Sequence, residues 1–398
     1  MFIFLRLNVE ELMKKIIAVL LLFFFLSGVM LAQDDDKDSE RHEFTMITKV
    51  KTTPVESQGR SGTCWAFATT SYVETELIRM GKGEHDISEM YFVRRTFPVK
   101  ADKYFRLHGK SNFGQGGQAH DVINVIKNHG LVPKQFYDAK IFDSTTYNHS
   151  ELTALLQSEL DAVLKKKGGK ISNLWRDVFC FTLDKYLGTP PEEFEYDGKK
   201  YTPKSFADSL GFNSEDYIEF TSYAHRPFYE KVNLEIPDNF AGAFYYNVPI
   251  DDLMNVIDNA LNNGFSVAWD GDVSDKYFFR KECYAVAPVD NLAEQIQYDD
   301  DGNEIIEPEL EKKITQQMRQ NSFDSFQTTD DHLMHITGIA KDQNDTKFYY
   351  TKNSWGTKKR KYDGYWYLSE PFVRLNTIAI MVHKDAVPEQ LKEKLEIK

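Results

Sequence analysis

Cysteine is scarce in this chain of 398 residues, which holds three: Cys64, Cys180 and Cys283. They stand too far apart for a zinc ribbon or a redox C-x-x-C motif, and they are too few for a disulfide scaffold. Long basic tracts are also missing, because 48 Lys and Arg face 61 Asp and Glu, giving a net charge of −13. Nucleic-acid binding needs clustered positive charge, so we expect no nucleic-acid partner.

Long apolar runs are missing too. Residues 16–26 form an unbroken apolar run of 11 residues, whereas a bilayer-spanning helix needs about 20. Two lysines precede this run, and Ala32 follows as a small residue suited to cleavage. The pattern predicts a signal peptide over residues 1–32, with Met13 as an alternative start of translation, and export to the periplasm or the extracellular space. A membrane anchor is the alternative, but we expect no stable membrane insertion.

Core-forming residues are plentiful: 41% of the chain is apolar, and 14% is aromatic. A wholly disordered chain is therefore excluded. Helical patterns fill residues 33–143, a stretch rich in Lys, Glu and Tyr over 144–246 indicates a mainly helical insertion, and strand patterns dominate 247–398. This order predicts an α+β protein of two packed lobes.

Hydrophobic periodicity predicts the elements that matter for the site. Helices are expected over residues 65–80, 119–128, 151–167, 173–187 and 251–263. Strands are expected over residues 265–269, 336–340, 348–352, 364–368 and 378–383.

One cysteine has a setting that suggests chemistry. Residues 58–67 read QGRSGTCWAF, so a glycine-bearing loop delivers Cys64 to the first turn of a predicted helix. Free backbone N–H groups and the helix dipole favour a thiolate at that position. A buried structural cysteine is the alternative, but it needs neither the glycine-rich approach nor the polar Gln58. The segment therefore favours a nucleophile.

A thiolate nucleophile needs an acid/base partner and a group that orients it. His332 begins a strand pattern that runs on through residues 336–340, and Asn353 follows the next predicted strand in the sequence NSWG. A hairpin between the two strands would place the Asn353 side-chain oxygen beside His332 and fix the imidazole tautomer. Trp355 would shield that hydrogen bond from water.

His335 competes with His332 for the role of base. On a strand, a residue three positions away points to the opposite face, so His335 reads as a packed or surface histidine. The two histidines could instead bind a metal ion from one face of a helix, but the strand pattern that follows them argues against it. We predict no metal and no cofactor.

These motifs resemble those of the papain-like cysteine peptidases, and within them the bleomycin hydrolase / aminopeptidase C branch. The papain signature C-G-[SA]-C-[WY] appears as SGTCW at residues 61–65. Its first cysteine is Ser61, so the disulfide of secreted papains is absent, as is usual in this branch. Residues 112–117 are similar to the glycine-pair substrate loop. His332 follows Cys64 by 268 residues instead of roughly 130–150, and the surplus falls mainly in the predicted insertion, which this branch also carries.

The resemblance covers about residues 45–385 and implies a papain-like fold: a helical lobe, an antiparallel β-barrel-like lobe and a helical insertion. It also implies a catalytic set and a substrate-binding set: Cys64, His332, Asn353 and Gln58, and Gly116, Gly117 and Trp355.

Each of these positions has an implied role. Cys64 attacks a peptide carbonyl to form a thioester, His332 acts as base and then acid, and Asn353 orients His332. The Gln58 side chain and the Cys64 backbone N–H form the oxyanion hole. The glycine pair lets a peptide backbone approach closely and pair as an extended strand.

The predicted function is that of a cysteine-type peptidase acting on peptides. The resemblance further implies an aminopeptidase whose own C-terminus lies in the cleft, and a homo-oligomer in the form of a hexameric ring. Residues 387–398 are longer and more charged than expected of such an arm. Three alternatives stay open: a cysteine endopeptidase, a catalytically silent peptide-binding protein on the same fold, and another Cys–His acyl transferase.

Overall fold

The computed structural model describes residues 41–140, 145–166, 168–289, 295, 297–298, 304–305 and 307–398. They fall into two units. In the smaller unit, β10 (Gln297–Tyr298) pairs antiparallel with β11 (Glu304–Ile305), and Arg41 Nη1 donates to the Glu307 carbonyl oxygen over 2.9 Å. The candidate site lies in the larger unit, residues 42–296 and 308–398. The predicted signal peptide, residues 1–32, lies outside the described residues.

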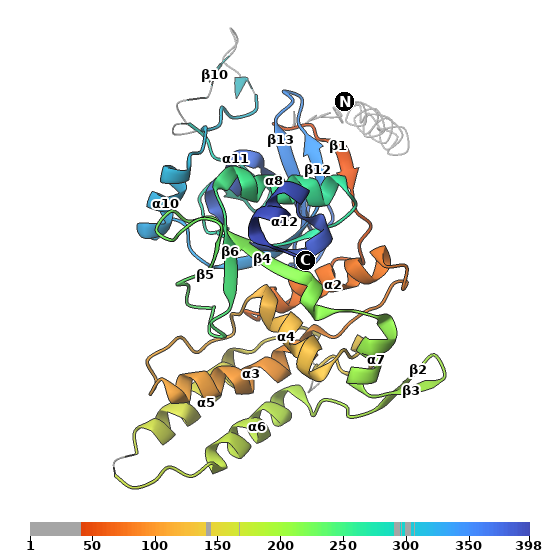
Figure 1. Cartoon of the computed structure of the whole chain (residues 1–398), viewed down its shortest axis with the longest axis vertical. Helices are drawn as coiled ribbons and strands as arrows, with labels where there is room; N and C mark the ends of the chain where they lie inside the picture. The colour runs from red at the N-terminus through yellow and green to blue at the C-terminus, as the bar shows by residue number, and fades with distance from the viewer. Residues whose placement is uncertain are drawn as a thin grey trace, which may run out of the picture. The chain divides into compact units, whose positions relative to one another are not determined.

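Helices gather in the first half of the larger unit (Figure 1). Their bounds are α2 Cys64–Arg79, α3 Glu89–Arg106, α4 Ala119–His129, α5 Ser150–Leu164, α6 Leu174–Leu187 and α7 Pro203–Leu210, with short 3₁₀ turns at Lys134–Phe136 and Ser214–Asp216. Two of these helices have side-chain N-caps. The Ser88 hydroxyl accepts the Tyr91 backbone N–H at the start of α3, and the Thr202 hydroxyl accepts the Ser205 backbone N–H at the start of α7. The small hairpin of β2 (Phe194–Tyr196) and β3 (Lys199–Tyr201) lies beside α7.

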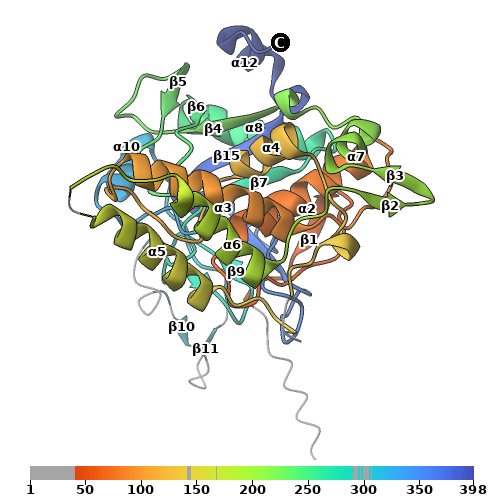
Figure 2. The same ribbon diagram turned by 90° about the horizontal axis from the view of Figure 1, so that it is seen from below.

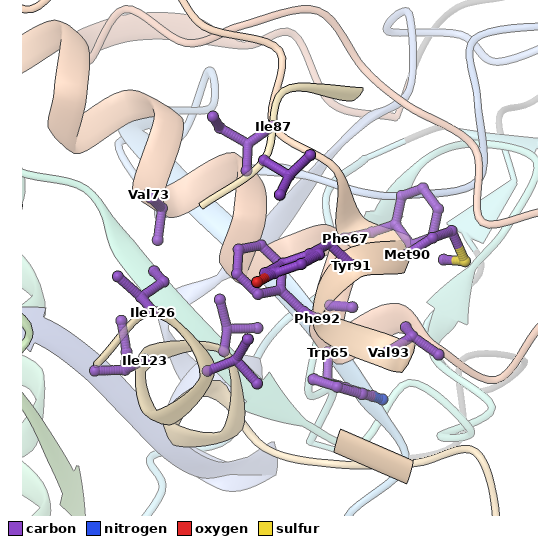
Figure 3. Close-up of a cluster of buried hydrophobic side chains, with 14 of the residues drawn as sticks. Trp65, Phe67, Val73, Ile87, Met90, Tyr91, Phe92, Val93, Ile123 and Ile126 are labelled. Atoms are coloured by element: carbon purple, nitrogen blue, oxygen red, sulfur yellow. The ribbon is translucent and has the colours of Figure 1, made fainter. Parts of the chain in front are cut away.

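One hydrophobic core joins these helices. Figure 3 shows its centre, where side chains of α2, α3 and α4 interleave, among them Trp65, Phe67, Tyr91 and Ile123. Buried residues of α5, α6 and α7 extend the same cluster. The predicted insertion therefore shares its core with the N-terminal helices.

The second half of the unit is an 11-stranded sheet in the order β5-β6-β4-β15-β7-β12-β13-β14-β9-β8, with β1 paired to β12. The strand bounds are β1 Thr45–Lys49, β4 Tyr217–Thr221, β5 Glu230–Asn233, β6 Phe244–Asn247, β7 Val267–Gly271, β8 Phe278–Phe279, β9 Tyr284–Ala285, β12 His332–Lys341, β13 Lys347–Lys352, β14 Tyr365–Ser369 and β15 Thr377–His383. The accompanying helices are α8 Ile250–Asn262, α10 Gln316–Asp324, α11 Glu370–Asn376 and α12 Glu389–Leu395, with a 3₁₀ turn at Lys384–Ala386.

Three of these strands come from the segment expected to be helical. β4, β5 and β6 lie within or at the edge of residues 144–246, and they extend the sheet beyond β15. The segment has aromatic and β-branched residues that suit a half-buried sheet, whereas its Lys and Glu content suggested helix. The predicted domain boundaries themselves stay a prediction.

The central strands are covered on both faces. Ala268 and Leu333 belong to the helical core, whereas Trp269 and Met334 belong to a second core that contains α8. Side chains of successive strand residues point to opposite faces, so α2 and α8 pack on opposite sides of β7 and β12. Within the described part of the chain, no helix combines the length and the apolar character needed to cross a bilayer.

The C-terminal tail packs on the α8 side of the sheet. Leu391 and Leu395 of α12 are buried in the second core, and Asn259 Nδ2 donates to the Ala386 carbonyl oxygen over 2.8 Å. Figure 2 shows α12 and the C-terminus beside α8 and β4, whereas α2 lies on the other side of the strands. The structure thus differs from the expectation of a C-terminal arm beside the nucleophile, because the tail has its own apolar stripe to bury.

We expect Leu391→Ala to lower the free energy of unfolding by about 2–4 kcal/mol, because it removes a buried side chain and leaves a cavity. Urea denaturation followed by circular dichroism measures the change. Glu393→Ala, on the exposed side of the same helix, is the matched control and should change stability by less than about 0.5 kcal/mol. Equal effects of the two substitutions would show that the tail does not pack as described.

Candidate active site

Cys64 is the first residue of α2 and ends a tight turn. The Ser61 hydroxyl donates to the Gln58 carbonyl oxygen over 2.8 Å and contacts Thr63 Oγ1 at 2.6 Å. The first N–H groups of an α-helix have no acceptor inside the helix. The turn therefore presents Cys64 at the positive end of α2, as the sequence predicted.

The Cys64 thiol lies against the beginning of β12. Its side chain is buried, and burial raises the pKa of the thiol to about 12. A hydrogen bond from the Leu333 backbone lowers this pKa, which places the thiol next to the residue that follows His332. Three carboxylates raise the pKa further: Asp270, Asp238 and Asp330.

His332 is oriented by Asn353. The imidazole Nε2 donates to Asn353 Oδ1 over 2.9 Å, and the same oxygen accepts the Ser354 backbone N–H over 2.7 Å. Because an amide oxygen only accepts, the proton of the neutral ring is on Nε2, and Nδ1 keeps a free lone pair. The Trp355 ring covers the imidazole, with ring centroids 4.9 Å apart.

Burial also acts on His332. It lowers the pKa of the imidazole to about 4, while the Asn353 hydrogen bond opposes this shift. Both shifts disfavour a lone charge, either the Cys64 thiolate or the His332 imidazolium. A thiolate–imidazolium pair has no net charge, so burial opposes such a pair less than it opposes either charge alone.

A group of hydrogen-bonded side chains also joins α2 to the sheet. Ser71 Oγ lies 2.9 Å from His335 Nδ1 and accepts from Lys352 Nζ over 2.7 Å. His335 is fully buried there, on the face of β12 shared with Leu333. It is a packed histidine, as the strand parity predicted.

Gln58 connects the Cys64 turn to the segment after β13. Its Nε2 donates to the Ser61 carbonyl oxygen over 2.7 Å, and its Oε1 accepts from Ser354 Oγ over 2.5 Å. The Gln58 backbone N–H donates to the Ser354 carbonyl oxygen over 2.8 Å. A primary amide has two N–H hydrogens, and these contacts use one of them. The other is available to a ligand.

The predicted substrate loop lies beside the same turn. Gln115 Oε1 accepts the Gly62 N–H over 2.7 Å, and the Gln115 carbonyl oxygen accepts Trp65 Nε1–H over 2.8 Å. A β-carbon at Gly116 would collide with the carboxylate of Asp238, and one at Gly117 would press on the Trp65 ring. Contacts inside the protein therefore require the glycine pair, and its role in substrate binding stays a prediction.

Sequence reasoning missed the three carboxylates that act on the thiol. They come from three separate segments: Asp238 between β5 and β6, Asp270 in β7 and Asp330 just before β12. The signal that could have revealed one of them is a carboxylate inside an otherwise apolar strand, since Asp270 is buried within β7. Among the described residues, no group of three or more His, Cys, Asp and Glu side chains is arranged to hold a metal ion.

Comparison with known proteins identifies the family. The sequence profile of the Peptidase C1-like family matches residues 104–398, which is more than half of the chain and includes His332 and Asn353. The protein belongs to this family. The papain-like family and the cysteine-peptidase class expected from the motifs are thereby confirmed, although the matched segment begins after Cys64.

Individual relatives agree with this assignment. Aminopeptidase C of Lactobacillus helveticus is 26% identical over 309 residues, covering 70% of this chain and 64% of that protein, so the match spans just under two thirds of its length. Aminopeptidase G of Lactobacillus delbrueckii subsp. lactis is 22% identical, covering 87% of this chain and 85% of that protein. A crystal structure of PepW from Lactobacillus rhamnosis superposes with a TM-score of 0.71 and 19% identity, covering 99% of this chain and 95% of that one. The predicted α+β papain-like fold is confirmed.

The prediction of export is wrong. The bacterial relatives are named aminopeptidase C and aminopeptidase G, a yeast relative that is 23% identical is named cysteine proteinase 1, mitochondrial, and none of these names denotes an exported protein. The signal peptide is likewise unsupported. An apolar run of 11 residues fits a buried helix or an interfacial segment as well as a signal peptide, so its hydropathy does not define a compartment.

We expect His332→Ala to slow alkylation of Cys64 by iodoacetamide at neutral pH by at least about a hundredfold. The thiolate is the reactive form, and without a proton acceptor the buried thiol keeps its raised pKa. Peptide mass spectrometry of timed samples measures the rate. His85→Ala, a partly exposed histidine outside the site, is the control. An unchanged alkylation rate in His332→Ala would show that His332 does not help to deprotonate the Cys64 thiol.

Proposed function

We propose that this protein is a cysteine aminopeptidase in which Cys64 and His332 are the reacting pair. One observation carries the proposal: the thiol at the start of α2 lies against the first residues of β12, where His332 is oriented by Asn353. The names of the relatives support the choice of aminopeptidase among peptidases.

The proposed reaction begins with transfer of the Cys64 proton to His332 Nδ1. The thiolate attacks the carbonyl carbon of the scissile peptide bond, and His332 then gives its proton to the leaving amine. A thioester remains on Cys64, and water activated by the neutral imidazole hydrolyses it. Asn353 keeps Nδ1 directed at the reaction through both steps, and Trp355 covers the ring.

Negative charge develops on the carbonyl oxygen in each tetrahedral intermediate. We propose that the free Gln58 side-chain N–H and the Cys64 backbone N–H donate to this oxygen. The hydrogen bonds of Gln58 to Ser61 and Ser354 fix its amide before substrate arrives, which lowers the cost of reorganisation.

An endopeptidase is the second candidate. The packing of α12 on the far face of the sheet favours it, because the tail does not occupy the position from which such an arm would restrict substrates to their N-termini. The hexameric ring implied by the resemblance stays a prediction, which sedimentation velocity tests.

We expect Cys64→Ala to abolish peptide hydrolysis, because it removes the sulfur atom that forms the proposed thioester. Release of free amino acids from a short peptide, followed by liquid chromatography, measures it. Cys180→Ala, a partly buried cysteine of α6, is the matched control and should keep wild-type activity. Hydrolysis by Cys64→Ala at the wild-type rate would refute the proposed function.

We expect Gln58→Ala to lower kcat by about 10²–10³ with a smaller change in KM, because the lost donor acts on charge that exists only in the transition state. Steady-state kinetics on the same peptide provides both constants. Gln317→Ala, an exposed glutamine of α10, controls for general effects of the substitution. A change confined to KM would place Gln58 in substrate binding instead.

A further inference from the structure

A loop of the β lobe lies over the glycine pair. Residues 234–243 connect β5 to β6 and reach the surface of α3 and α4, where Phe240 packs over Lys100 Nζ at 4.9 Å. Asn239 holds the loop in shape, since its side chain accepts the Ala243 N–H over 2.9 Å and donates to the Leu234 carbonyl oxygen over 3.2 Å. We call residues 234–243 the β5–β6 loop.

The β5–β6 loop brings the Asp238 carboxylate directly against Gly116. Asp238 Oδ1 accepts from Asn112 Nδ2 over 2.8 Å, and its other oxygen fills the space above Gly116. Lys100 Nζ holds the glycine loop from below through the carbonyl oxygens of Gly114 and Gly116. A peptide that paired along the glycines would therefore meet Asp238, so the loop ends the path for residues on the N-terminal side of the scissile bond.

Beyond Asp238 lie two carboxylates that lack sufficient partners. Asp270 is 3% exposed, and its carboxyl lies within hydrogen-bonding reach of Asp330 and Gln118, but neither of its oxygens accepts a hydrogen bond of good geometry from an N–H or O–H donor. Asp330 Oδ1 accepts from Gln118 Nε2 over 2.9 Å, and the Asp330 carboxyl also lies beside the Asp270 carboxyl and the Asp238 backbone, although no donor meets its buried Oδ2 in good geometry. Two buried carboxylates that face each other with few donors are costly, and their oxygens are the acceptors that an ammonium group with three N–H donors satisfies.

Lys100, a buried cation of α3, does not satisfy these oxygens by hydrogen bonds. Lys100 interacts electrostatically with Asp238 and Asp330, but its hydrogen bonds go to backbone carbonyls of the glycine loop. Burial and the neighbouring carboxylates raise the pKa of Asp330 to about 7 and that of Asp270 well above its ordinary value, so this buried cluster favours protonated carboxyls. A bound ammonium would supply the missing positive charge.

These three carboxylates are also the ones that act on the Cys64 thiol. We propose that Asp238, Asp270 and Asp330, enclosed by the β5–β6 loop, bind the protonated α-amino group of a peptide substrate and so limit cleavage to bonds near a free N-terminus. The proposal rests on the proposed function of Cys64 as nucleophile. In this proposal the β5–β6 loop and the three carboxylates restrict the enzyme to free N-termini. The C-terminal tail, which packs on the α8 side of the sheet, has no part in this restriction.

The test compares cleavage of one tetrapeptide that has a free N-terminus with cleavage of the same tetrapeptide after N-acetylation. The wild-type protein should cleave the free peptide with a kcat/KM at least about a hundredfold higher, because acetylation removes the charge and two of the donors. Asp270→Asn should lower kcat/KM for the free peptide by about tenfold to a hundredfold, mainly through KM, as expected for loss of a charged hydrogen bond. Asp251→Asn, the same change at an exposed residue of α8, should match the wild type.

Alkylation of Cys64 by iodoacetamide separates the two proposals. Asp270→Asn should be alkylated at least as fast as the wild type, because removal of a nearby negative charge makes the thiolate easier to form. Equal cleavage of both peptides by the wild type overturns this inference and leaves the nucleophile intact, as does unchanged selectivity in Asp270→Asn. Absence of both alkylation and cleavage overturns the proposed function and this inference with it. If Asp270→Asn does not fold, Asp330→Asn and the wild-type comparison decide the question.

Discussion

The packing of α2 against β12 is the constraint on which the candidate site depends. Cys64 and Ser71 are seven residues apart on α2, two helical turns along one face, so fixing Ser71 also fixes the height and rotation of Cys64. Ser71 is fixed by His335 of β12 and by Lys352 at the end of β13. Lys352 is followed directly by Asn353. The same short chain of hydrogen bonds thus sets the positions of the thiol, the imidazole and the residue that orients it.

Buried charge strengthens this constraint. Glu74, one turn beyond Ser71, accepts from Thr53 Oγ1 over 2.6 Å and from the Ile87 N–H over 2.8 Å. Burial raises the pKa of Glu74 and lowers that of Lys352, since each charge is poorly solvated, while their mutual attraction opposes both shifts. Few arrangements of α2 on the sheet satisfy all of these groups together, and a shift of one residue would leave several of them without partners.

The sequence was informative where the signal is local. A glycine-bearing turn before an apolar helix placed Cys64, and two successive strand patterns placed His332 and Asn353, because periodicity and turn chemistry act over a few residues. It was silent about Asp238, Asp270 and Asp330, which converge only after β5, β7 and β12 enter one sheet. Strands β4 to β6 were read as part of a helical insertion because their polar residues masked a weak alternation. Compartment was misjudged because 11 apolar residues are compatible with several environments.

The contact of Asp238 with Gly116 has a consequence for how this protein can vary. The two residues occupy one volume, since any side chain at position 116 would intrude on the carboxylate at position 238. A related sequence with a larger residue at the first position must have a smaller one at the second, or a shorter connection between β5 and β6. Substitutions at positions 116 and 238 should therefore occur together. A relative with a smaller residue at position 238 would lack the carboxylate that meets a peptide along the glycine pair.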